Sequence, residues 1–339
     1  MLLENIDSEI LKICQEVLKL KYINPINQDS EKKKFFSSEN YNPKFKYLPK
    51  NLRLERYIKQ LEKLYNETNS NLYKNKIKKL IIWINLLDSV GSSNFSQNSI
   101  TYYSKPSPKL VKMAKKLLRL KEENELKELN SQEVSKILDK ELKRFPGWTS
   151  KKALNLGSRV DDVTMEKTIY VKLGEKFSKE DVKRLIVHEI NVHTQRSFNG
   201  TKQNYKIFEY GTANYEETEE GLAVYTEEKN NLLQNKTLKN YAGRVLAIDL
   251  ALKYSFRKTF FELNKYFSDD EAYHLTLRAK RGLKETSNQG AFTKDLIYLK
   301  GYLELKSHLE ENPKDLDLLF KGRIGIKDLK DVKELLPMQ

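Results

Sequence analysis

The sequence predicts a predominantly helical α+β protein, and three observations carry this prediction. Apolar residues recur at helical spacing along most of the chain, most clearly over residues 51–88. Two short segments, 159–164 and 167–173, instead alternate in polarity and are rich in β-branched residues, as strands are. Because 39% of the 339 residues are apolar, the chain can bury a sizeable core.

The N-terminal part is predicted to form helices that are joined by polar segments. Residues 10–18 have apolar side chains at helical spacing, and this pattern fades before Pro25. A loop rich in Asn, Ser and Lys follows to about Pro49, and residues 51–88 then form one long helix or two helices in series. The sequence Gly-Ser-Ser at residues 91–93 ends that pattern.

Three further elements are expected before the middle of the chain. Residues 99–103 have the β-branched and aromatic content of a short strand. The sequence Pro-Ser-Pro at 106–108 is expected to open a helix that runs to about Leu120, and residues 131–142 form another helix. The character of the sequence changes at about residue 145, where we place a domain boundary.

The second half of the chain begins with the two predicted strands, of which the second ends at Gly174. Ser178 with Asp181 three residues later resembles a capping box, which predicts the start of a helix. After Gly200, another helix is expected to begin near Glu216.

Positive charge is concentrated in the N-terminal part. The whole sequence has a formal net charge of +15, yet residues 41–120 hold 17 basic and 4 acidic residues, whereas residues 151–339 hold 33 and 29. We therefore predict a basic helical N-terminal region, residues 1–145, followed by a second region, residues 146–339. A basic stripe is either a solvated lysine face or a surface that attracts nucleic acid, an anionic membrane or an acidic protein tail. No nucleic-acid-binding motif accompanies it, so nucleic acid is not the expected partner.

Neither a membrane nor an oxidising compartment is expected. The longest apolar run, residues 80–87, contains Asn85 and ends at Asp88, far short of the ~20 residues that span a membrane. The N-terminus begins with acidic residues, unlike a signal peptide. Cys14 is the only cysteine in the sequence, which excludes a disulfide framework. We therefore expect a cytoplasmic protein.

Two of the four histidines lie in one hexapeptide, residues 188–193 (His-Glu-Ile-Asn-Val-His). Two imidazoles and one carboxylate can hold Zn²⁺ and leave a fourth position for water, whose proton a neighbouring glutamate can take. On a regular helix, residues five apart point about 140° apart. A π-bulge would restore a shared face, so the metal hypothesis predicts a distorted helix between Glu189 and His193. Otherwise the two histidines lie on different faces of an ordinary helix.

A third ligand is expected downstream on a separate helix. Residues 215–228 contain six glutamates together with small residues that would allow close helix packing. Glu216 and Glu220 would share a helical face, as would Glu217 and Glu220. The alternative is that these glutamates lie on a solvated acidic helix, and this must be true of most of the six.

These motifs resemble the QEGLA-motif family. The resemblance rests on residues 188–196, 199–200 and 215–225, on a second block at 278–282 and 290–301, and more weakly on 42–47 and 103–107. Bacterial members of this family are labelled flavohaemoglobin-expression modulators. Its animal members are microtubule-associated tyrosine carboxypeptidases, which remove the C-terminal tyrosine of α-tubulin.

The resemblance implies a zincin-like metallopeptidase core with a small antiparallel sheet in residues 146–339. In such a core, the predicted strand 167–173 would be the edge that pairs with a peptide substrate. The resemblance also implies the Zn²⁺ ligands His188, His193 and Glu220, with Glu189 as general base.

Two positions depart from the family pattern. Glu219 stands where the family name has Gln, which leaves the implied ligand Glu220 intact. Asn191 stands where glycine is common in the family, on the segment that must bulge. Asn tolerates unusual backbone angles better than most residues, so metal binding is still expected.

A carboxypeptidase also needs a fixed cation for the terminal carboxylate of its substrate, best supplied by an arginine fork. Arg278, Arg281 and Lys294 lie in the second matching block and are the candidates; the alternative for the arginines is a solvated basic turn. Tyr298 is either a hydrogen-bond donor to the developing oxyanion or a core tyrosine.

The sequence therefore predicts a zinc-dependent metallocarboxypeptidase whose substrate is a protein or peptide with a free C-terminus. An acidic tail, such as that of tubulin, would suit the basic stripe. Two alternatives remain open: a non-catalytic polyanion- or filament-binding protein with a structural metal, and an endopeptidase with the same site and an open cleft.

Overall fold

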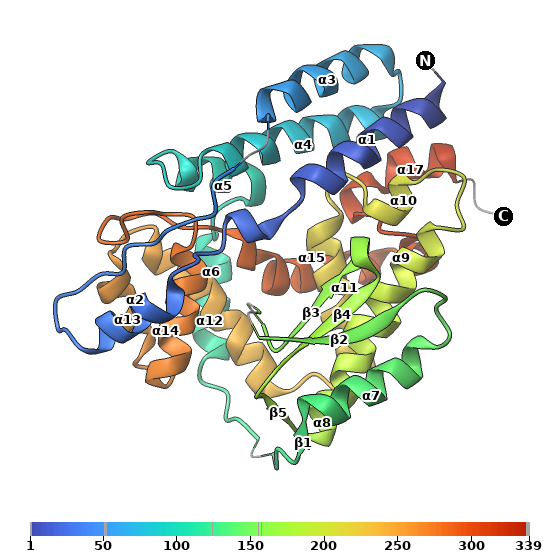
Figure 1. Cartoon of the computed structure of the whole chain (residues 1–339). Helices are drawn as coiled ribbons and strands as arrows, with labels where there is room; N and C mark the ends of the chain where they lie inside the picture. Colours follow the sequence, from blue (N-terminus) through green and yellow to red (C-terminus); the bar gives the residue numbers. More distant parts are fainter. Residues whose placement is uncertain (1, 51–52, 124, 155, 157, 337–339) are drawn as a thin grey trace. The chain divides into compact units, whose positions relative to one another are not determined.

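The computed structural model describes residues 2–50, 53–123, 125–154, 156 and 158–336 (Figure 1). The chain divides into two compact units, and each unit is assembled from segments that are distant in the sequence. The first unit comprises Met1–Leu11, Glu122–Gln234 and Gly301–Gln339, and the second comprises Lys12–Lys121 and Asn235–Lys300. The predicted domain boundary near residue 145 remains a prediction.

The first unit contains a small sheet and the helices that surround it. Its strands are β1 (Leu129–Asn130), β2 (Thr149–Ala153), β3 (Val160–Val163), β4 (Thr168–Lys172) and β5 (Lys176–Phe177). Its helices are α7 (Ser131–Leu142), η2 (Thr164–Glu166), α8 (Lys179–Leu185), η3 (Ile186–Thr194), α9 (Gln195–Gly200), α10 (Ile207–Tyr210), α11 (Tyr215–Lys229), α16 (Asp315–Leu319), η5 (Ile326–Asp328) and α17 (Leu329–Leu335). Helices α1 (Leu3–Val17) and α15 (Ile297–Glu311) have residues in both units.

The sheet has three strands in the order β2-β4-β3, with β4 parallel to β2 and antiparallel to β3. Thr149 pairs with Thr168, and Val160 pairs with Val171. Strands β1 and β5 form a separate antiparallel pair. Both predicted strands are confirmed, but the sheet is mixed rather than wholly antiparallel. Because β4 lies between two partners, the expectation that it forms the sheet edge is wrong; within the described part of the sheet, the edges are β2 and β3.

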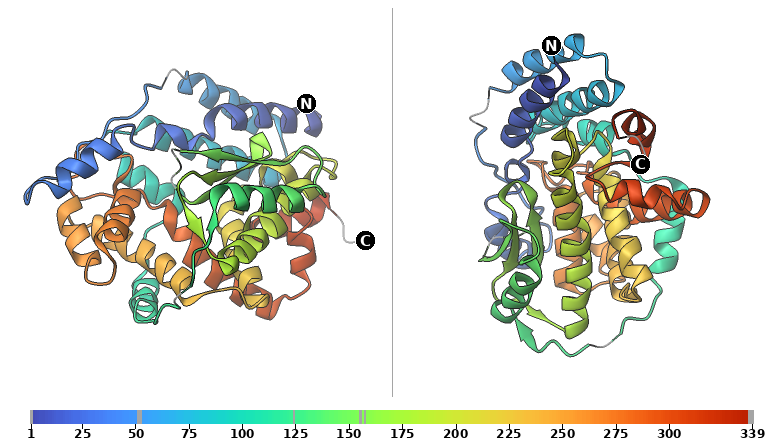
Figure 2. Two further views of the ribbon diagram at one scale, coloured as in Figure 1. Left: turned by 60° about the horizontal axis from the view of Figure 1, so that its bottom comes forward. Right: turned by 90° about the vertical axis from the view of Figure 1, so that its right-hand side faces the viewer.

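The core of the first unit anchors the helix that carries the histidine motif. The sheet, α7, α8 and η3 share one apolar cluster, made of Val134, Leu138, Leu142, Phe145, Trp148, Val160, Ile169, Val171, Phe177, Val182, Leu185 and Ile190. Ser178 and Asp181 cap α8 reciprocally, which confirms the predicted capping box. The right-hand view of Figure 2 shows η3 between the sheet and α11, in agreement with its contacts to β3 and α11.

The second unit is helical, apart from an isolated bridge between Lys44 and Glu285 in its described part. Its helices are η1 (Leu20–Tyr22), α2 (Gln28–Phe36), α3 (Leu54–Glu67), α4 (Asn71–Asp88), α5 (Phe95–Tyr103), α6 (Pro108–Leu117), α12 (Asn235–Ala251), α13 (Phe256–Leu263), α14 (Asp269–Lys280) and η4 (Lys294–Leu296). The ring of Phe35 on α2 contacts Phe256 and Phe260 on α13, which joins segments far apart in the sequence.

Most of the predicted helices are confirmed. The helices expected at 10–18, 106–120, 131–142 and near Glu216 correspond to α1, α6, α7 and α11. The region 51–88 forms two helices in series, α3 and α4, although residues 51 and 52 themselves lie outside the described residues. None of the described helices has the length and apolar content that crossing a membrane requires.

Two N-terminal predictions are wrong. Residues 99–103 belong to the helix α5 and not to a strand, because Phe95, Ser99 and Tyr102 are buried at the helical spacing i, i+4, i+7. The α2 helix lies within the segment that was expected to be a loop. Its single strongly buried apolar residue, Phe35, gives too weak a periodic signal for a sequence-based prediction.

Candidate metal centre

The helix that carries both motif histidines is distorted, as the metal hypothesis requires. Element η3 is a π-helix, and at its end the backbone N–H of Gln195 donates to the carbonyl of Ile190, five residues earlier. The extra residue in the turn brings the rings of His188 and His193 together, with centroids 4.8 Å apart and planes inclined at 86°. The predicted distortion is therefore confirmed.

Two side-chain hydrogen bonds accompany the π-helix. The hydroxyl of Thr194 donates to the backbone carbonyl of Glu189 at 2.9 Å. Arg144, just beyond α7, donates to the side-chain oxygen of Asn191 at 2.6 Å. Asn191, which stands where glycine is common in the family, is thus held from outside the helix.

Helix α11 places a third candidate ligand against the two histidines. Oε2 of Glu220 lies 3.4 Å from Nε2 of His188 and 3.8 Å from Nε2 of His193. Ligand atoms in a tetrahedral zinc site, each about 2.1 Å from the ion, lie about 3.4 Å apart. The two separations from Oε2 of Glu220 are therefore close to the distance between two ligands of one metal ion.

The second nitrogen of each imidazole is held by a buried carboxylate. Nδ1 of His188 donates to Oε1 of Glu227 at 2.7 Å, and Nδ1 of His193 donates to Oε1 of Glu219 at 3.1 Å. Glu227 and Glu219 both come from α11. Glu227 follows Glu220 by seven residues, so Glu227 and Glu220 lie on the same face of the helix. Because an ionised carboxylate only accepts hydrogen bonds, each imidazole keeps its Nε2 lone pair for a metal ion.

Two arginines, one partly exposed and one buried, donate hydrogen bonds to these two carboxylates. Arg184 donates to Oε1 of Glu227 at 3.0 Å. Arg196 is completely buried and donates to Oε2 of Glu219, and its other nitrogens donate to three backbone carbonyls between residues 319 and 324. Burial raises the pKa of Glu219, but Arg196, Arg323 and His193 lower it more, to about 2. Glu219 is therefore ionised at neutral pH.

The electrostatics around the two histidines favour a positive charge. Burial lowers the pKa of His188, but nearby carboxylates, first that of Glu189, raise it more, to about 10. Burial also lowers the pKa of His193, yet Glu219 and Glu220 raise it above its ordinary value. A cluster of carboxylates that favours protonated imidazole in this way is also suited to a divalent cation.

The chemistry of the donors suits a transition metal ion such as zinc. His188, Glu189 and His193 are buried and place potential ligand atoms within 4.8 Å of one another. Imidazole nitrogen combined with carboxylate oxygen is a common zinc donor set. Both Glu189 and Glu220 are candidates for the third ligand, and Oε2 of Glu220 lies close to the Nε2 atoms of both histidines.

Asp162 on the edge strand β3 is a further acid beside this site. Burial, together with the charge of Glu189, raises the pKa of Asp162 to about 7, although His193 and Arg323 act in the opposite direction. The hydroxyl of Thr164 donates to its Oδ1 at 2.9 Å, whereas its buried Oδ2 has no donor among the described residues. The edge of the sheet thus places an acid with a raised pKa beside the candidate metal centre.

The arginines predicted to bind the substrate carboxylate lie in the second unit, around a buried acid. Arg278 donates to both oxygens of Asp295, at 2.8 Å to Oδ1. Arg281 lies 3.5 Å from the same Oδ1 and donates to Asn24 at 3.0 Å. Burial raises the pKa of Asp295, but the neighbouring arginines lower it well below its ordinary value. The two arginines are therefore not a solvated turn, and their role toward a substrate remains a prediction.

Lys294 and Tyr298, also in the second unit, lie beside aromatic rings. The ring of Tyr298 stacks on that of Tyr241 with centroids 5.1 Å apart, and the guanidinium of Arg244 lies 4.1 Å from the Tyr298 centroid. Nζ of Lys294 lies 5.7 Å from the ring centroid of Tyr103. The oxyanion role of Tyr298 and the carboxylate-binding role of Lys294 remain predictions.

Two residues of the metal centre are not predicted from the sequence alone. No role is assigned to Glu219 from the sequence, yet Glu219 is buried and accepts a hydrogen bond from His193. Glu227 is one of the six glutamates expected to be mostly solvated, yet it is completely buried. The signal that was available is spacing: Glu227 follows the implied ligand Glu220 by two helical turns.

Comparison with known proteins agrees with these motifs. Residues 33–339 match the family model described as microtubule-associated tyrosine carboxypeptidase. The chain belongs to this family. Its match over most of the sequence includes every residue of the metal centre described above.

Curated members of the family are similar over a shorter stretch. The rat and human proteins named microtubule-associated tyrosine carboxypeptidase 1 are each 32% identical over 161 residues, which is 45% of this chain and 32% of theirs. The mouse protein named putative tyrosine carboxypeptidase MATCAP2 is 30% identical over 161 residues, 44% of this chain and 30% of its own. The aligned part thus spans about a third of the length of these relatives.

Proposed function

We propose that this chain is a zinc-dependent metallocarboxypeptidase that hydrolyses the peptide bond preceding a free C-terminal residue of a protein. The observation that carries the proposal is that Oε2 of Glu220 lies 3.4 Å from Nε2 of His188 and 3.8 Å from Nε2 of His193, both of which have Glu189 nearby. Family membership supports it, because the curated relatives are named as tyrosine carboxypeptidases.

In this proposal the chain holds and orients the ligands of the metal ion. His188, His193 and Glu220 are the ligands, and the hydrogen bonds from Nδ1 to Glu227 and Glu219 fix the tautomer and the direction of both rings. Zinc supplies Lewis acidity, which polarises the scissile carbonyl and makes a water nucleophile accessible at neutral pH.

Glu189 is the proposed general base. Its carboxylate is buried and lies within 4.8 Å of the potential ligand atoms of both histidines, so it can reach a water held there. Glu189 takes a proton from the attacking water and passes it to the nitrogen of the leaving residue. Its position directly after a ligand histidine fixes its backbone on the π-helix, where Thr194 holds its carbonyl.

Exopeptidase specificity requires that the terminal carboxylate of the substrate is recognised. We keep Arg278, Arg281 and Lys294 as candidates for this role and Tyr298 as the candidate oxyanion donor. Arg278 is already bidentate on Asp295, so its direct use would require that this ion pair opens or that the substrate binds an outer edge of the guanidinium.

The relatives are named for their association with microtubules. For this chain we propose a cytoplasmic protein substrate with an acidic, tyrosine-ending tail, such as that of tubulin. The basic N-terminal part of the sequence is compatible with such a partner.

The test is hydrolysis of an acidic peptide that ends in tyrosine, followed by mass spectrometry. We expect the wild type to release one tyrosine and Glu189→Gln to be slower by at least about a hundredfold while retaining its metal. The matched control is Glu180→Gln on the exposed side of α8, which should leave the rate unchanged.

Three results would contradict the proposal. Undiminished cleavage by Glu189→Gln would remove the assigned base. Equal cleavage of the C-terminally amidated peptide would indicate an endopeptidase. Absence of cleavage, with metal bound and polyanion binding retained, would indicate a non-catalytic binding protein with a structural metal.

A further inference from the structure

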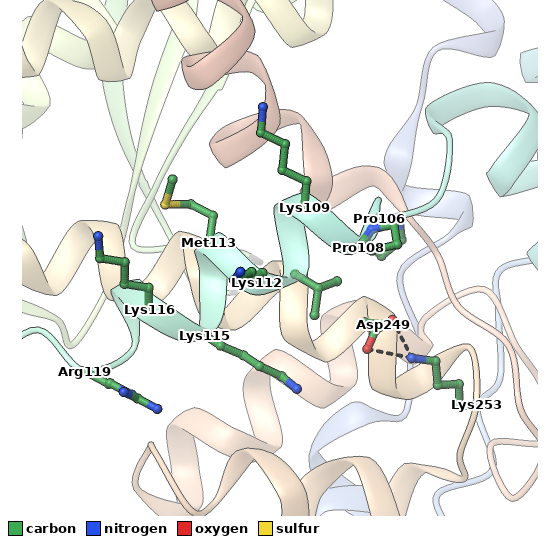
Figure 3. A pocket seen from close by; sticks show the side chains of 11 residues that line it. Pro106, Pro108, Lys109, Lys112, Met113, Lys115, Lys116, Arg119, Asp249 and Lys253 are labelled. Atoms are coloured by element: carbon green, nitrogen blue, oxygen red, sulfur yellow. Dashed lines mark hydrogen bonds and ion pairs between the residues drawn. The ribbon is translucent and has the colours of Figure 1, made fainter.

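An open groove in the second unit combines basic and apolar side chains. Helix α6, the residues before it and part of α12 enclose a volume of about 810 Å³ (Figure 3). Its basic side chains come from α6 and the turn that follows it: Lys109, Lys112, Lys115, Lys116 and Arg119. Its apolar part consists of Pro106, Pro108, Val111 and the exposed Met113. Figure 3 shows the basic side chains extending away from the α6 ribbon in several directions.

The positive charge of this groove is not neutralised by the rest of the described chain. All five basic side chains from α6 and the turn after it are exposed, and none forms an ion pair with a described residue. The sequence of α6 contains no acidic residue. The acid that lines the groove, Asp249, is already bonded to Lys253 at 2.7 and 2.8 Å.

Two other surface lysines of the same unit share one acidic partner. Lys258 on α13 pairs with Glu262 at 3.2 Å, and Lys265, just beyond α13, pairs with the same glutamate at 2.6 Å. On α6, by contrast, Lys112 and Lys116 are four residues apart with like charge, an arrangement that destabilises a helix. An anionic partner would relieve this repulsion.

We propose that this groove binds an acidic segment of polypeptide in an extended conformation. From Lys109 to Lys116 the helix rises about 10 Å, which is the length of about three extended residues. Side chains of an extended segment alternate in direction, so acidic residues can face the lysines while apolar residues between them contact Met113 and its neighbours. This surface goes beyond the proposed hydrolysis, because binding to it needs neither the metal ion nor Glu189.

The lining of the groove favours polypeptide over other polyanions. It contains no aromatic side chain, so single-stranded nucleic acid would lack a platform on which its bases could stack. It is concave, whereas an anionic bilayer is bound by an apolar face that can enter the interface. An acidic peptide with interspersed apolar residues uses both the charge and the apolar part.

The test measures binding of a labelled, N-acetylated and C-terminally amidated decaglutamate to the full chain by fluorescence anisotropy. The amide end keeps the probe from being a carboxypeptidase substrate, so failure here is distinct from failure of the proposed hydrolysis. We expect K112E/K116E to bind at least about tenfold more weakly, with the wild-type affinity falling as salt is added. The matched control is K136E/K140E on α7, where both lysines are exposed and are also four residues apart. The affinity of this control for the peptide should stay within about twofold of that of the wild type.

A second peptide tests the apolar part of the groove. An amidated peptide that alternates Glu and Leu should bind more tightly than decaglutamate, and Met113→Ser should remove that gain. Four results would overturn the proposal. The first two are that neither peptide binds at low salt, or that both double variants lose the same amount of affinity. The other two are that the alternating peptide binds no more tightly than decaglutamate, or that decathymidylate or phosphatidylserine vesicles bind more tightly than the peptides and lose this binding in K112E/K116E. Unchanged thermal unfolding of the variants confirms that they are folded.

Discussion

Single atoms decide how the two histidines can act. Nδ1 of each ring donates to a carboxylate of α11, and Nε2 of each ring approaches Glu220. In this tautomer the Nε2 atom of each ring keeps its lone pair and lies within 3.8 Å of Oε2 of Glu220. Glu219 and Glu227 accept these two hydrogen bonds, so we expect them to support metal binding by orienting the proposed ligands.

Replacement of Glu227 by alanine should weaken zinc binding by 10- to 100-fold, roughly the usual effect of losing such a partner. The variant removes the acceptor of Nδ1 of His188 and one acceptor of Arg184. Competition with a chromogenic chelator gives the affinity. Glu228→Ala is the control, because Glu228 is the neighbouring acid and pairs with Lys306 instead, at 2.6 Å. Equal affinity of the two variants would contradict the assigned role.

Zinc binding should release protons, and its affinity should rise with pH. The pKa of His188 is raised to about 10 in the metal-free pocket, so a proton competes with the metal ion below that pH. The same raised pKa of His188 adds to the free energy of unfolding of the metal-free protein, because the folded state binds this proton more tightly than the unfolded state does. The contribution is complete below about pH 6.5 and is lost as the pH rises toward 10. Calorimetry at pH 7.5 in buffers with different ionisation heats measures the release; identical binding heats would show that His188 carries no proton.

At the scale of elements, local patterns were predictable and long-range pairing was not. The π-helix was predictable because His188 and His193 are five apart and a shared ligand position requires one extra residue in the turn. Strand β2 was not, since Lys151 and Lys152 are exposed and the strand is defined by its parallel pairing with β4, a distant contact. The prediction that Glu220 is the third ligand came from the resemblance, because spacing alone left several glutamates of α11 as equal candidates.

The contact between α11 and α15 sets the position of Glu220. A side chain at Gly221 would lie 2.4 Å from the backbone carbonyl carbon and oxygen of Gly301, and one at Gly301 would lie 2.0 Å from the carbonyl oxygen of Glu217. Neither backbone can rotate away as a flexible side chain could. The two helices can therefore approach this closely only with glycine at both positions.

We accordingly expect Gly221→Ala to destabilise the fold by about 1–3 kcal/mol and to weaken zinc binding, because separating α11 from α15 displaces Glu220. Chemical denaturation and chelator competition measure the two effects. Ser307→Ala, at an exposed position of α15, should change the free energy of unfolding by less than about 0.5 kcal/mol. A Gly221→Ala protein with wild-type stability would show that the helix contact is not tight.

At the scale of the whole molecule, the ligands of the proposed metal ion all belong to the first unit. They come from η3 and α11, so a bound ion would connect two elements that are separated in the chain by residues 195–214. The division into two discontinuous units was not predictable from composition or periodicity. It depends on which distant segments pack together, whereas the charge pattern distinguishes only an N-terminal part of the sequence from the rest.

Removal of the metal should therefore loosen the first unit selectively. A ligand at 100 to 1,000 times its dissociation constant stabilises the state that binds it by about 2.7 to 4.1 kcal/mol. After chelation, hydrogen exchange should accelerate in η3 and α11 and stay unchanged in α13 and α14. Uniform acceleration in both units, or none at all, would contradict a metal site confined to the first unit.

The most direct test of the account is the zinc content of the purified protein, measured by elemental mass spectrometry for the wild type beside His193→Ala. The account predicts about one zinc ion per chain in the wild type and loss of that zinc in the variant. A wild type without metal, or a His193→Ala protein that keeps its full zinc content, would contradict the central claim that the distorted helix and α11 form a zinc site.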